Sequence, residues 1–365
     1  MSRTAKLRVG VLLGGQSTEH EISILSARNV VAALDRNRFE PVLVGIGKDG
    51  RWLMQDERDL LCGPTDPRRV SLQPGLPVPA LGPAGSDAAS RPTQLDVIFP
   101  VLHGTLGEDG AIQGLCEVAG IACVGAGILG SAIGMDKDVM KRLLREADVP
   151  IAEFRTLRRD LFDRDPAGAL REIETLGFPM FTKPANAGSS VGVRKVASAA
   201  QLPAAIRHAF EFDTKVLAEA AVVGREIELA VLDGHPPTVS GAGEIVVEHR
   251  DGFYSYDAKY VDEGGARLEI PAGIPAESLA RAQTLALRAF EVLECAGMAR
   301  VDMFLTPAGK LLINEINTIP GFTAISMYPK LMALAGVSPT ELVTRLIKLA
   351  IERHEREHGL ERSAK

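Results

Sequence analysis

Apolar and polar positions along the chain repeat with two different periods, and segments of the two kinds follow each other in turn. Short continuous apolar runs predict buried strands at 7–13, 41–47, 95–102 and 121–124. Apolar residues with helical spacing predict helices at 21–34 and 111–119. Strands that alternate with helices indicate a parallel sheet over roughly the first 130 residues.

The pattern changes after a predicted helix at 136–147, which ends at Asp148-Val149-Pro150. Further strands are predicted at 151–157, 178–183, 191–196, 215–219, 226–232 and 241–247. Further helices are predicted at 167–176, 199–210, 277–295 and from Pro339 to about His354. We therefore predict an α/β fold in three units: a Rossmann-like domain at 1–134 and two α+β units at 135–222 and 223–365.

A predicted hairpin at 301–317 carries a group of metal-binding residue types. If its turn is centred between Ala308 and Gly309, Asp302 faces Glu315. Strand alternation then places Asn317 on the face of Glu315. Facing carboxylates repel each other unless a cation lies between them, and carboxylate and amide oxygens suit Mg²⁺. The alternative is a solvated hairpin with incidental acids, but the flanking residues are apolar for a surface ribbon.

Composition narrows the class of protein. A chain of 365 residues needs more than one core, and its formal charge of −6 argues against a nucleic-acid partner. The first apolar run is too short for a signal peptide or a membrane span and predicts a buried strand. Free thiols in place of disulfides suit the reducing cytoplasm, where we expect the protein. The segment at 62–94 is rich in Pro and Gly and predicts an irregular insertion. The cysteines lack metal-site spacing and are predicted to be buried free thiols: Cys62, Cys116, Cys123 and Cys295.

Two lysines lie where a phosphate would bind. In KPANAGSSVG (183–192), a strand delivers Lys183 to a Gly-Ser-Ser turn whose N–H groups and hydroxyls suit phosphate oxygens. The segment is not a Walker A sequence, and a plain hairpin turn is the alternative. Lys137 opens a helix, where its charge opposes the helix dipole. An anionic ligand at that helix end would explain it, whereas an exposed surface lysine is the alternative.

Other segments are less specific indications of nucleotide contacts. Glu219 ends a strand and suits an adenine edge, and Glu226 suits ribose hydroxyls, unless both are exposed strand acids. GAGILG (125–130) matches the GxGxxG pattern, but the acid expected at the end of a second strand is missing. We interpret these glycines as a tight turn before the helix at 136, and we disfavour an oxidoreductase.

Polar loops surround the same sheet edge. Glu19 follows the first strand and His103 the third, at the end of a parallel sheet where ligands bind, although core or capping roles are the alternative. FYSYDAKY (253–260) holds three of the four tyrosines in a polar loop. Such a loop either closes over a ligand or forms a packed aromatic corner.

Taken together, these segments resemble the ATP-grasp ligases, and among them the D-alanine–D-alanine ligases. The resemblance covers nearly the whole chain. The order is GGQSTEHEIS (14–23), HGTLGEDG, MDK, KPANAGSSVG, FYSYDAKY, RVDMF and NEINTIPGFTAISMYPKL (314–331), which is highly specific. The sequence departs from the family pattern in the long insertion after Cys62 and in the small residues Ala187 and Ala324. The resemblance implies a three-domain ATP-grasp fold and a homodimer.

The resemblance also implies a reaction and its cofactors. Members phosphorylate the carboxylate of one D-alanine with ATP, and the amine of a second D-alanine attacks the acyl phosphate. Two Mg²⁺ ions, with Mn²⁺ also acceptable, would be held by Asp302, Glu315 and Asn317. Lys259 would contact the transferred phosphate. The remaining ATP positions would be Lys137, Lys183, Ser190, Glu219, Ala220, Val222 and Glu226.

By the same resemblance, Glu19 binds the ammonium of the first D-alanine, with His103 nearby. Arg300 and the backbone of Gly321 stabilise the tetrahedral species, and Ser326 binds the second carboxylate. Ser189 and Tyr260 link the closing loop to the site of Glu19.

Tyr260 also bears on specificity, because it favours an amine acceptor and hence D-alanyl-D-alanine over D-alanyl-D-lactate. The alternatives are a ligase that uses D-lactate or D-serine, or an inactive nucleotide-binding regulatory module. The intact Arg300, metal carboxylates and lysines favour an enzyme.

Overall fold

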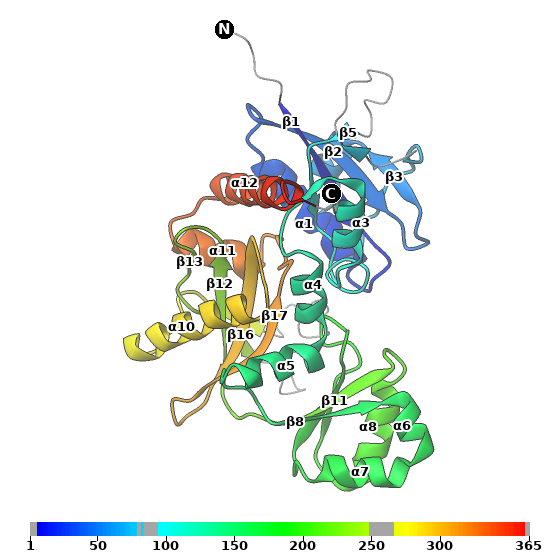
Figure 1. Ribbon diagram of the computed structural model, residues 1–365, viewed down its shortest axis with the longest axis vertical. Helices are drawn as coiled ribbons and strands as arrows, with labels where there is room; N and C mark the ends of the chain where they lie inside the picture. Colours follow the sequence, from blue (N-terminus) through cyan, green and yellow to red (C-terminus); the bar gives the residue numbers. More distant parts are fainter. Residues whose placement is uncertain (1–5, 79–81, 84–93, 248–265, 362–365) are drawn as a thin grey trace.

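The computed structural model describes residues 6–78, 82–83, 94–247 and 266–361, which form three main sheets (Figure 1). The N-terminal sheet has the order β3-β2-β1-β6-β7. Its strands are β1 (Leu7–Gly14), β2 (Phe39–Ile46), β3 (Trp52–Gln55), β6 (Val97–Pro100) and β7 (Ala122–Cys123). The pairings of β1 with β2 and β6 are parallel, as predicted, but β3 adds an antiparallel edge that the pattern did not indicate. Helices α1 (His20–Ala33) and α3 (Ala111–Ala119) lie near their predicted bounds.

The central unit is a four-stranded sheet with the order β10-β9-β11-β8 and antiparallel pairings. Its strands are β8 (Phe154–Arg158), β9 (Met180–Pro184), β10 (Arg194–Val196) and β11 (Lys215–Ala220). Its helices are α6 (Arg159–Arg164), α7 (Pro166–Glu174) and α8 (Leu202–Ala209), with a short 3₁₀ turn η2 (Ala199–Gln201) before α8. Fully buried Met180, Ile206 and Val216 join the sheet to the helices, which leaves the other face toward the rest of the molecule.

The third sheet has the order β15-β14-β12-β16-β17, with β13 paired to β12. Its strands are β12 (Arg225–Leu232), β13 (Thr238–Val239), β14 (Gly243–Val247), β15 (Ala266–Glu269), β16 (Met298–Leu305) and β17 (Leu311–Asn317). Helices α10 (Ala276–Val292) and α5 (Lys137–Glu146) cover one face, where Leu144 and Phe290 pack with Ile313. The residues of the opposite face therefore remain available for a site.

The β16–β17 hairpin pairs Asp302 with Glu315, as predicted, but for a different reason. Leu305 pairs with Leu311, so the turn is centred on Ala308 rather than between Ala308 and Gly309. A register shift next to Asp302 inserts one extra residue, Asn314, into β17. Without this bulge Asp302 would face Asn314, and the two carboxylates would not be opposed.

The C-terminal helices return to the first sheet. After α11 (Met327–Leu334), helix α12 (Pro339–His358) buries Leu346 and Ile347 in one core with Val97 and Val124 (Figure 1). Arg353 of α12 donates to the carbonyl oxygens of Cys123 (2.8 Å) and Gly125 (2.5 Å). The last part of the chain thus ties the third unit to the first.

Two local predictions were wrong. Helix α4 (Ile128–Met135) occupies the place of the expected tight turn, and a Cβ on its Gly130 would stand 2.2 Å from the Glu294 carbonyl oxygen. Cys62, at the end of α2 (Glu57–Cys62), is exposed and Cys295 is only partly buried, whereas Cys116 and Cys123 are buried free thiols as predicted.

The first part of the insertion, residues 63–78, contains no helix or strand and only an isolated bridge between Leu53 and Pro77, so the predicted irregular segment is confirmed there. Met54 N–H donates to the Leu76 carbonyl at 2.9 Å, which aligns the end of this segment with β3. Further on, the short strands β4 (Gly82–Pro83) and β5 (Gln94–Leu95) pair in parallel, and β5 lies where the start of the predicted 95–102 strand was expected. None of the helices within the described residues is both long and apolar enough to cross a membrane.

Candidate active site

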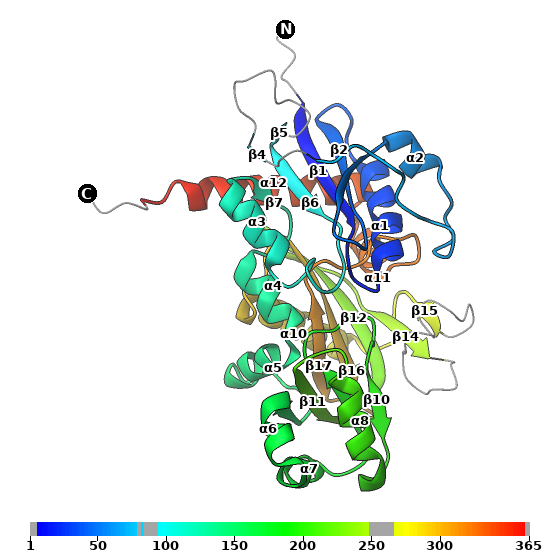
Figure 2. The same cartoon turned by 90° about the vertical axis from the view of Figure 1, so that its right-hand side faces the viewer.

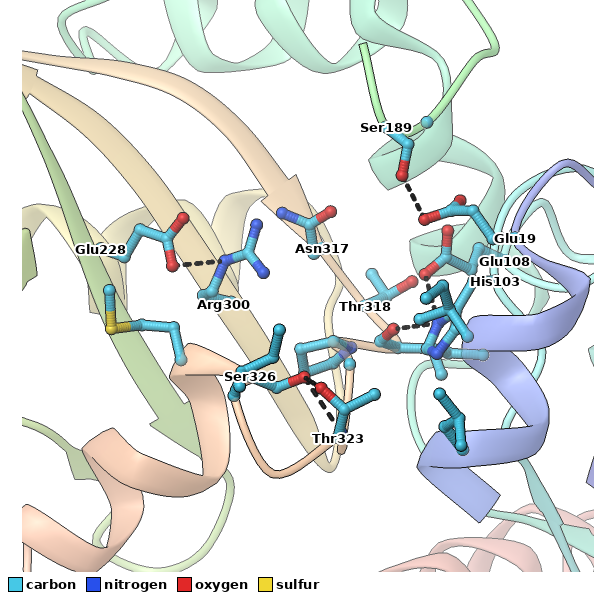
Figure 3. A pocket seen from close by; sticks show the side chains of 18 of the residues that line it. Glu19, His103, Glu108, Ser189, Glu228, Arg300, Asn317, Thr318, Thr323 and Ser326 are labelled. Carbon is cyan, nitrogen blue, oxygen red and sulfur yellow. Dashed lines mark hydrogen bonds and ion pairs between the residues drawn. The ribbon is translucent and has the colours of Figure 1, made fainter. Parts of the chain in front are cut away.

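A cavity of about 1130 Å³ opens where the three units meet. Its walls come from α1, the start of α5, the Gly/Ser loop at 186–192, and the free face of the third sheet with the loop that follows β17 (Figure 3). Predicted site residues that line it are Glu19, His103, Lys137, Ser189, Arg300, Glu315, Asn317, Gly321 and Ser326. Segments far apart in the sequence therefore converge on one space.

The sheet wall of the cavity presents alternate residues of β12 and β16. Arg300 lies between two carboxylates: its Nε is 3.1 Å from Glu228 Oε2 and 2.7 Å from Asp302 Oδ1, and its Nη2 is 2.6 Å from Asp302 Oδ2. Burial alone would lower the pKa of Arg300, but the two carboxylates raise it well above its ordinary value. Arg300 is thus a fixed positive charge at the cavity wall.

The predicted metal ligands lie beside this arginine. Asn317 Nδ2 donates to Asp302 Oδ2 at 3.1 Å, and this leaves the amide oxygen for another partner. Lys137 Nζ lies 3.5 Å from Glu315 Oε2. Among the described residues, no group of three or more His, Cys, Asp and Glu side chains is arranged to hold a metal. Two carboxylates and one amide nevertheless form an all-oxygen donor set of the kind that Mg²⁺ prefers, so the residues fit the ion.

Lys137 is held inside the site and is not a surface lysine. The Asp136 side chain caps α5 by accepting from the N–H groups of Asp138 and Val139 at 3.1 and 3.0 Å. This cap fixes the first turn of the helix, and Lys137 Nζ then donates to the Ala187 carbonyl at 2.8 Å. The cation therefore bridges α5 and the Gly/Ser loop.

The Gly/Ser loop has a conformation that L-residues rarely adopt. Ser189 and Ser190 have φ of +50° and +59°, and Val191 N–H donates to the Gly188 carbonyl at 3.1 Å, so these residues form a tight turn with positive φ at both central positions. The Ser189 hydroxyl donates to the Glu19 carboxylate. A Cβ on Gly188 would stand 2.9 Å from Glu19 Oε2, so a larger residue here would displace the Glu19 carboxylate. Glu19 occupies the N-cap position of α1 without a side-chain capping bond, which argues against a capping role.

Buried His103 lies next to Glu108, a partly buried residue that sequence reasoning missed. His103 Nδ1 lies 3.1 Å from the Ile319 carbonyl and 3.8 Å from Glu108 Oε1. Burial would lower the pKa of His103, but the carboxylates of Glu108 and Glu19 raise it above its ordinary value. Burial raises the pKa of Glu108. Its position inside the HGTLGEDG segment was the only signal in the sequence.

The loop after β17 is anchored to α1. Phe322 N–H donates to Ser26 Oγ at 3.2 Å, and Asn29 Nδ2 donates to the Phe322 carbonyl at 2.7 Å. These bonds hold Gly321 at the cavity, where a Cβ would stand 2.8 Å from Ser326 Oγ. Ser326 precedes the first residue of α11, so the N–H groups of that helix face the same region.

A second polar cluster is buried deeper, between α5 and the central sheet. Lys141 Nζ lies 2.5 Å from Glu219 Oε2, and Lys183 Nζ lies 3.0 Å from Glu219 Oε1. Burial would raise the pKa of Glu219, but the two ammonium groups hold it below its ordinary value, while burial lowers the pKa of Lys141. Sequence reasoning missed Lys141, although its spacing places it one helical turn after Lys137.

The remaining predicted residues lie around the segment that joins β11 to β12. Ala220 ends β11, and its N–H donates to the Glu153 carbonyl at 2.9 Å. Val222 lies in the connection, and Glu226 is on β12, two residues before Glu228 and on the same face. Ser190 follows Ser189 in the loop. Lys259 and Tyr260 lie outside the described residues, and the roles of all these residues stay predictions.

Family models match both halves of the chain. Residues 8–126 match the model described as D-ala D-ala ligase N-terminus, and residues 143–348 match the one described as D-ala D-ala ligase C-terminus. The chain is 51% identical to D-alanine–D-alanine ligase A of Chromobacterium violaceum, over 98% of this chain and 99% of the relative. It is 49% identical to D-alanine–D-alanine ligase A of Escherichia coli K12, over 97% and 98%.

Solved structures agree with the sequence comparisons. The D-alanine–D-alanine ligase of Coxiella burnetii superposes with a TM-score of 0.82 at 35% identity, covering 97% of each chain. The VanG D-Ala:D-Ser ligase of Enterococcus faecalis superposes with a TM-score of 0.81 at 37% identity, covering 95% of this chain and all of that one. The predicted α/β fold of the ATP-grasp ligases is therefore confirmed.

Proposed function

The chain belongs to the D-alanine–D-alanine ligase family, and on this premise we propose that it is an ATP-dependent ligase that joins two D-alanines into D-alanyl-D-alanine for peptidoglycan synthesis. One observation carries the proposal: Glu19, Lys137, Arg300 and Glu315, from four different segments, line a single cavity. A pure nucleotide-binding module would have no use for a fixed arginine beside oxygen ligands, because transition-state stabilisation serves only turnover.

In the first step, a carboxylate oxygen of one D-alanine attacks the γ-phosphorus of ATP, and ADP leaves. Glu19 binds the ammonium of this D-alanine, and Ser189 fixes the Glu19 carboxylate. Lys137 and Lys183 neutralise phosphate charge, and the N–H groups at Ser189 and Ser190 surround phosphate oxygens. Glu219, Ala220, Val222 and Glu226 take the adenosine part.

In the second step, the amine of the other D-alanine attacks the acyl carbon, phosphate leaves, and the amine loses a proton. Negative charge gathers on the carbonyl oxygen as the carbon becomes tetrahedral, and Arg300 and the backbone of Gly321 stabilise it. Ser326, at the start of α11, binds the second carboxylate. On the predicted loop, Lys259 contacts the phosphoryl group that is transferred in the first step, and Tyr260 links the loop through Ser189 to the site of Glu19.

The proposed metal ligands are Asp302, Glu315 and Asn317, which would hold two Mg²⁺ ions, or Mn²⁺. When bound, the ions offset the charge that develops on the transferred phosphoryl group. The protein's own contribution is the geometry of the hairpin: the bulge at Asn314 turns Glu315 to face Asp302.

We further propose a cytoplasmic homodimer. Exposed apolar side chains gather on α3 and α4, which lie side by side (Figure 2): Leu115 (41% exposed), Val118 (89%), Ile128 (48%) and Leu129 (60%). Apolar surface of this kind, on helices of the first unit, suits contact with a second copy.

The function is tested by phosphate release with Mg-ATP and D-alanine, beside L-alanine, D-serine and D-lactate. We expect release that requires D-alanine and yields the dipeptide. Dipeptide analysis decides the acceptor, because release only with a D-alanine plus D-serine or D-lactate pair would transfer the proposal to those ligases. Reactions without ATP or without amino acid are the controls, and no release with any donor would contradict the proposal.

Replacing Ser189 with Ala is expected to raise the KM for D-alanine about tenfold. The hydroxyl donates a charge-assisted hydrogen bond to the Glu19 carboxylate, and such bonds contribute about 1.5 kcal/mol. Steady-state kinetics with saturating ATP measures the change. Ser198→Ala, at a loop residue before η2 that makes no side-chain cap, is the matched control. A KM within twofold of the wild type in Ser189→Ala would contradict the proposed link.

A further inference from the structure

Two buried carboxylates face each other across β12 and β16, next to the cavity. The register pairs Glu228 with Asp302, and the two residues are only 4% and 9% exposed. Like charges directly opposite in a sheet destabilise it, and an isolated buried charge costs several kcal/mol. The pair therefore needs a cation, and the contacts of Arg300 identify that cation.

Arg300 lies diagonally from Glu228, because Arg300 pairs with Ala230, two residues further along β12. All three charged side chains share one face of the sheet, since strand alternation repeats every second residue. Figure 3 shows Glu228 pointing at the inner nitrogen of the guanidinium, whose outer nitrogens extend into the cavity. Glu228 thus contacts the part of the guanidinium that lies nearest the Arg300 backbone.

If Asp302 is also a metal ligand, its negative charge does not neutralise Arg300 alone. A carboxylate that coordinates a divalent ion shares its charge between that ion and the guanidinium, and the two cations repel each other. Glu228 also contacts Arg300, and it is not a proposed ligand. Its charge would offset that repulsion while Asp302 is shared with the ion.

We propose that Glu228 is a positioning residue, which holds the Arg300 guanidinium toward the developing oxyanion while Asp302 binds a cation. This inference rests on the proposed function, since it presumes that Arg300 stabilises the tetrahedral species. It assigns Glu228 a part in the second step only. Binding of the nucleotide does not depend on it.

The test measures binding rather than turnover. The probe is a phosphinate analogue of D-alanyl-D-alanine, whose tetrahedral phosphorus replaces the attacked carbon, titrated in the presence of Mg-ADP. Glu228→Gln is expected to bind the phosphinate about 10- to 100-fold more weakly, because a mispositioned oxyanion donor loses much of its effect, while Mg-ADP affinity stays within twofold. Turnover should lose kcat by a similar factor with little change in the KM for ATP.

The control is Glu244→Gln. Glu244 is another buried carboxylate of the same sheet, and it pairs with an arginine, Arg225 Nε to Glu244 Oε1 at 2.7 Å. On β14 it pairs with Ile227, so it faces away from Glu228. This variant should bind both the phosphinate and Mg-ADP as the wild type does. It reports the effect of neutralising a buried acid in this sheet.

A double-variant cycle separates positioning from a direct contact. If Glu228 acts through Arg300, Arg300→Lys and the double variant Glu228→Gln/Arg300→Lys should bind the phosphinate equally weakly. Additive losses, or a Glu228→Gln variant with wild-type phosphinate affinity, would overturn the proposal. Glu228→Asp keeps the charge but shortens the side chain by one methylene. It replaces the Gln variant in the test if that variant does not fold. Wild-type affinity in Glu228→Asp would also overturn it.

Failure of the proposed function would look different. In that case the wild type itself would neither form dipeptide nor bind the phosphinate. Wild-type activity combined with an unaffected Glu228→Gln variant would leave the proposed function intact and remove only this inference.

Discussion

Glu315→Gln is expected to lower kcat for dipeptide formation by roughly a thousandfold, because losing about 4 kcal/mol of charge stabilisation slows a step by that factor. The amide keeps the shape of the side chain but removes one of the two facing carboxylates of the hairpin. Two cations lose a partner: the proposed metal, and Lys137, whose Nζ lies 3.5 Å from Glu315 Oε2. Steady-state kinetics at saturating ATP and D-alanine measures the loss.

A second readout separates metal binding from folding. The Mg²⁺ concentration that supports half-maximal ATP binding should rise about tenfold or more in Glu315→Gln, since carboxylate charge sets the affinity of such sites. Glu277→Gln, at an exposed acid in the first turn of α10, is the matched control and should keep wild-type Mg²⁺ dependence. Unchanged Mg²⁺ dependence together with less than tenfold loss of kcat would refute Glu315 as a ligand.

The pairing of Asp302 with Glu315 shows how far sequence reasoning reaches. Turn residues and strand alternation fix a hairpin to within about one residue, and the correct pair emerged from a turn centre that was off by half a residue. The bulge at Asn314 compensated for the error. Nothing in the local sequence requires a bulge there, because its energy depends on packing across the whole sheet.

The contacts of charged residues within helices and strands were harder to predict. Lys141 lies on a helix that would normally expose its lysines to water, so its burial next to Glu219 depends on the central sheet, which is distant in sequence. Glu228 lies two residues from Glu226, and alternation gives both the same face without saying which one meets Arg300. Such contacts arise from strand order, which a pattern of single residues does not encode.

Non-local packing also explains why the neighbours of the insertion could not be predicted. Its first residues, 65–68, line the cavity, although a Pro- and Gly-rich segment without periodicity gives no sign of its neighbours. Likewise, the amphipathic pattern of α12 indicated that one face is buried but not that this face covers the N-terminal sheet. Period and composition describe elements, while partners follow from the topology.

Glu219→Gln is expected to lower the free energy of unfolding by about 3–5 kcal/mol at pH 7, measured by urea denaturation without nucleotide. Its carboxylate is the partner of both Lys141, which is fully buried, and Lys183, and it lies 2.5 and 3.0 Å from their ammonium groups. Removing one side of a buried ion pair leaves an uncompensated charge, whereas removing both sides is tolerated. The double variant Glu219→Gln/Lys141→Met should therefore recover much of the loss.

The pH dependence of stability distinguishes the contribution of Glu219 from that of Lys141. Folding lowers the pKa of Glu219. Its carboxylate therefore contributes fully to the free energy of unfolding above the ordinary carboxyl pKa of 4.5, and this contribution is lost as the pH falls through the pKa of Glu219 in the folded protein. The Glu219→Gln variant should therefore not show this loss of stability at acid pH. In that variant the buried Lys141, whose pKa is also lowered, should make stability rise with pH toward the ordinary lysine value of 10.5, because the unfolded chain holds the proton more tightly. A variant with wild-type stability at pH 7 and no rise at alkaline pH would show that the cluster is not a coupled ion pair, and Lys141 would then need another partner.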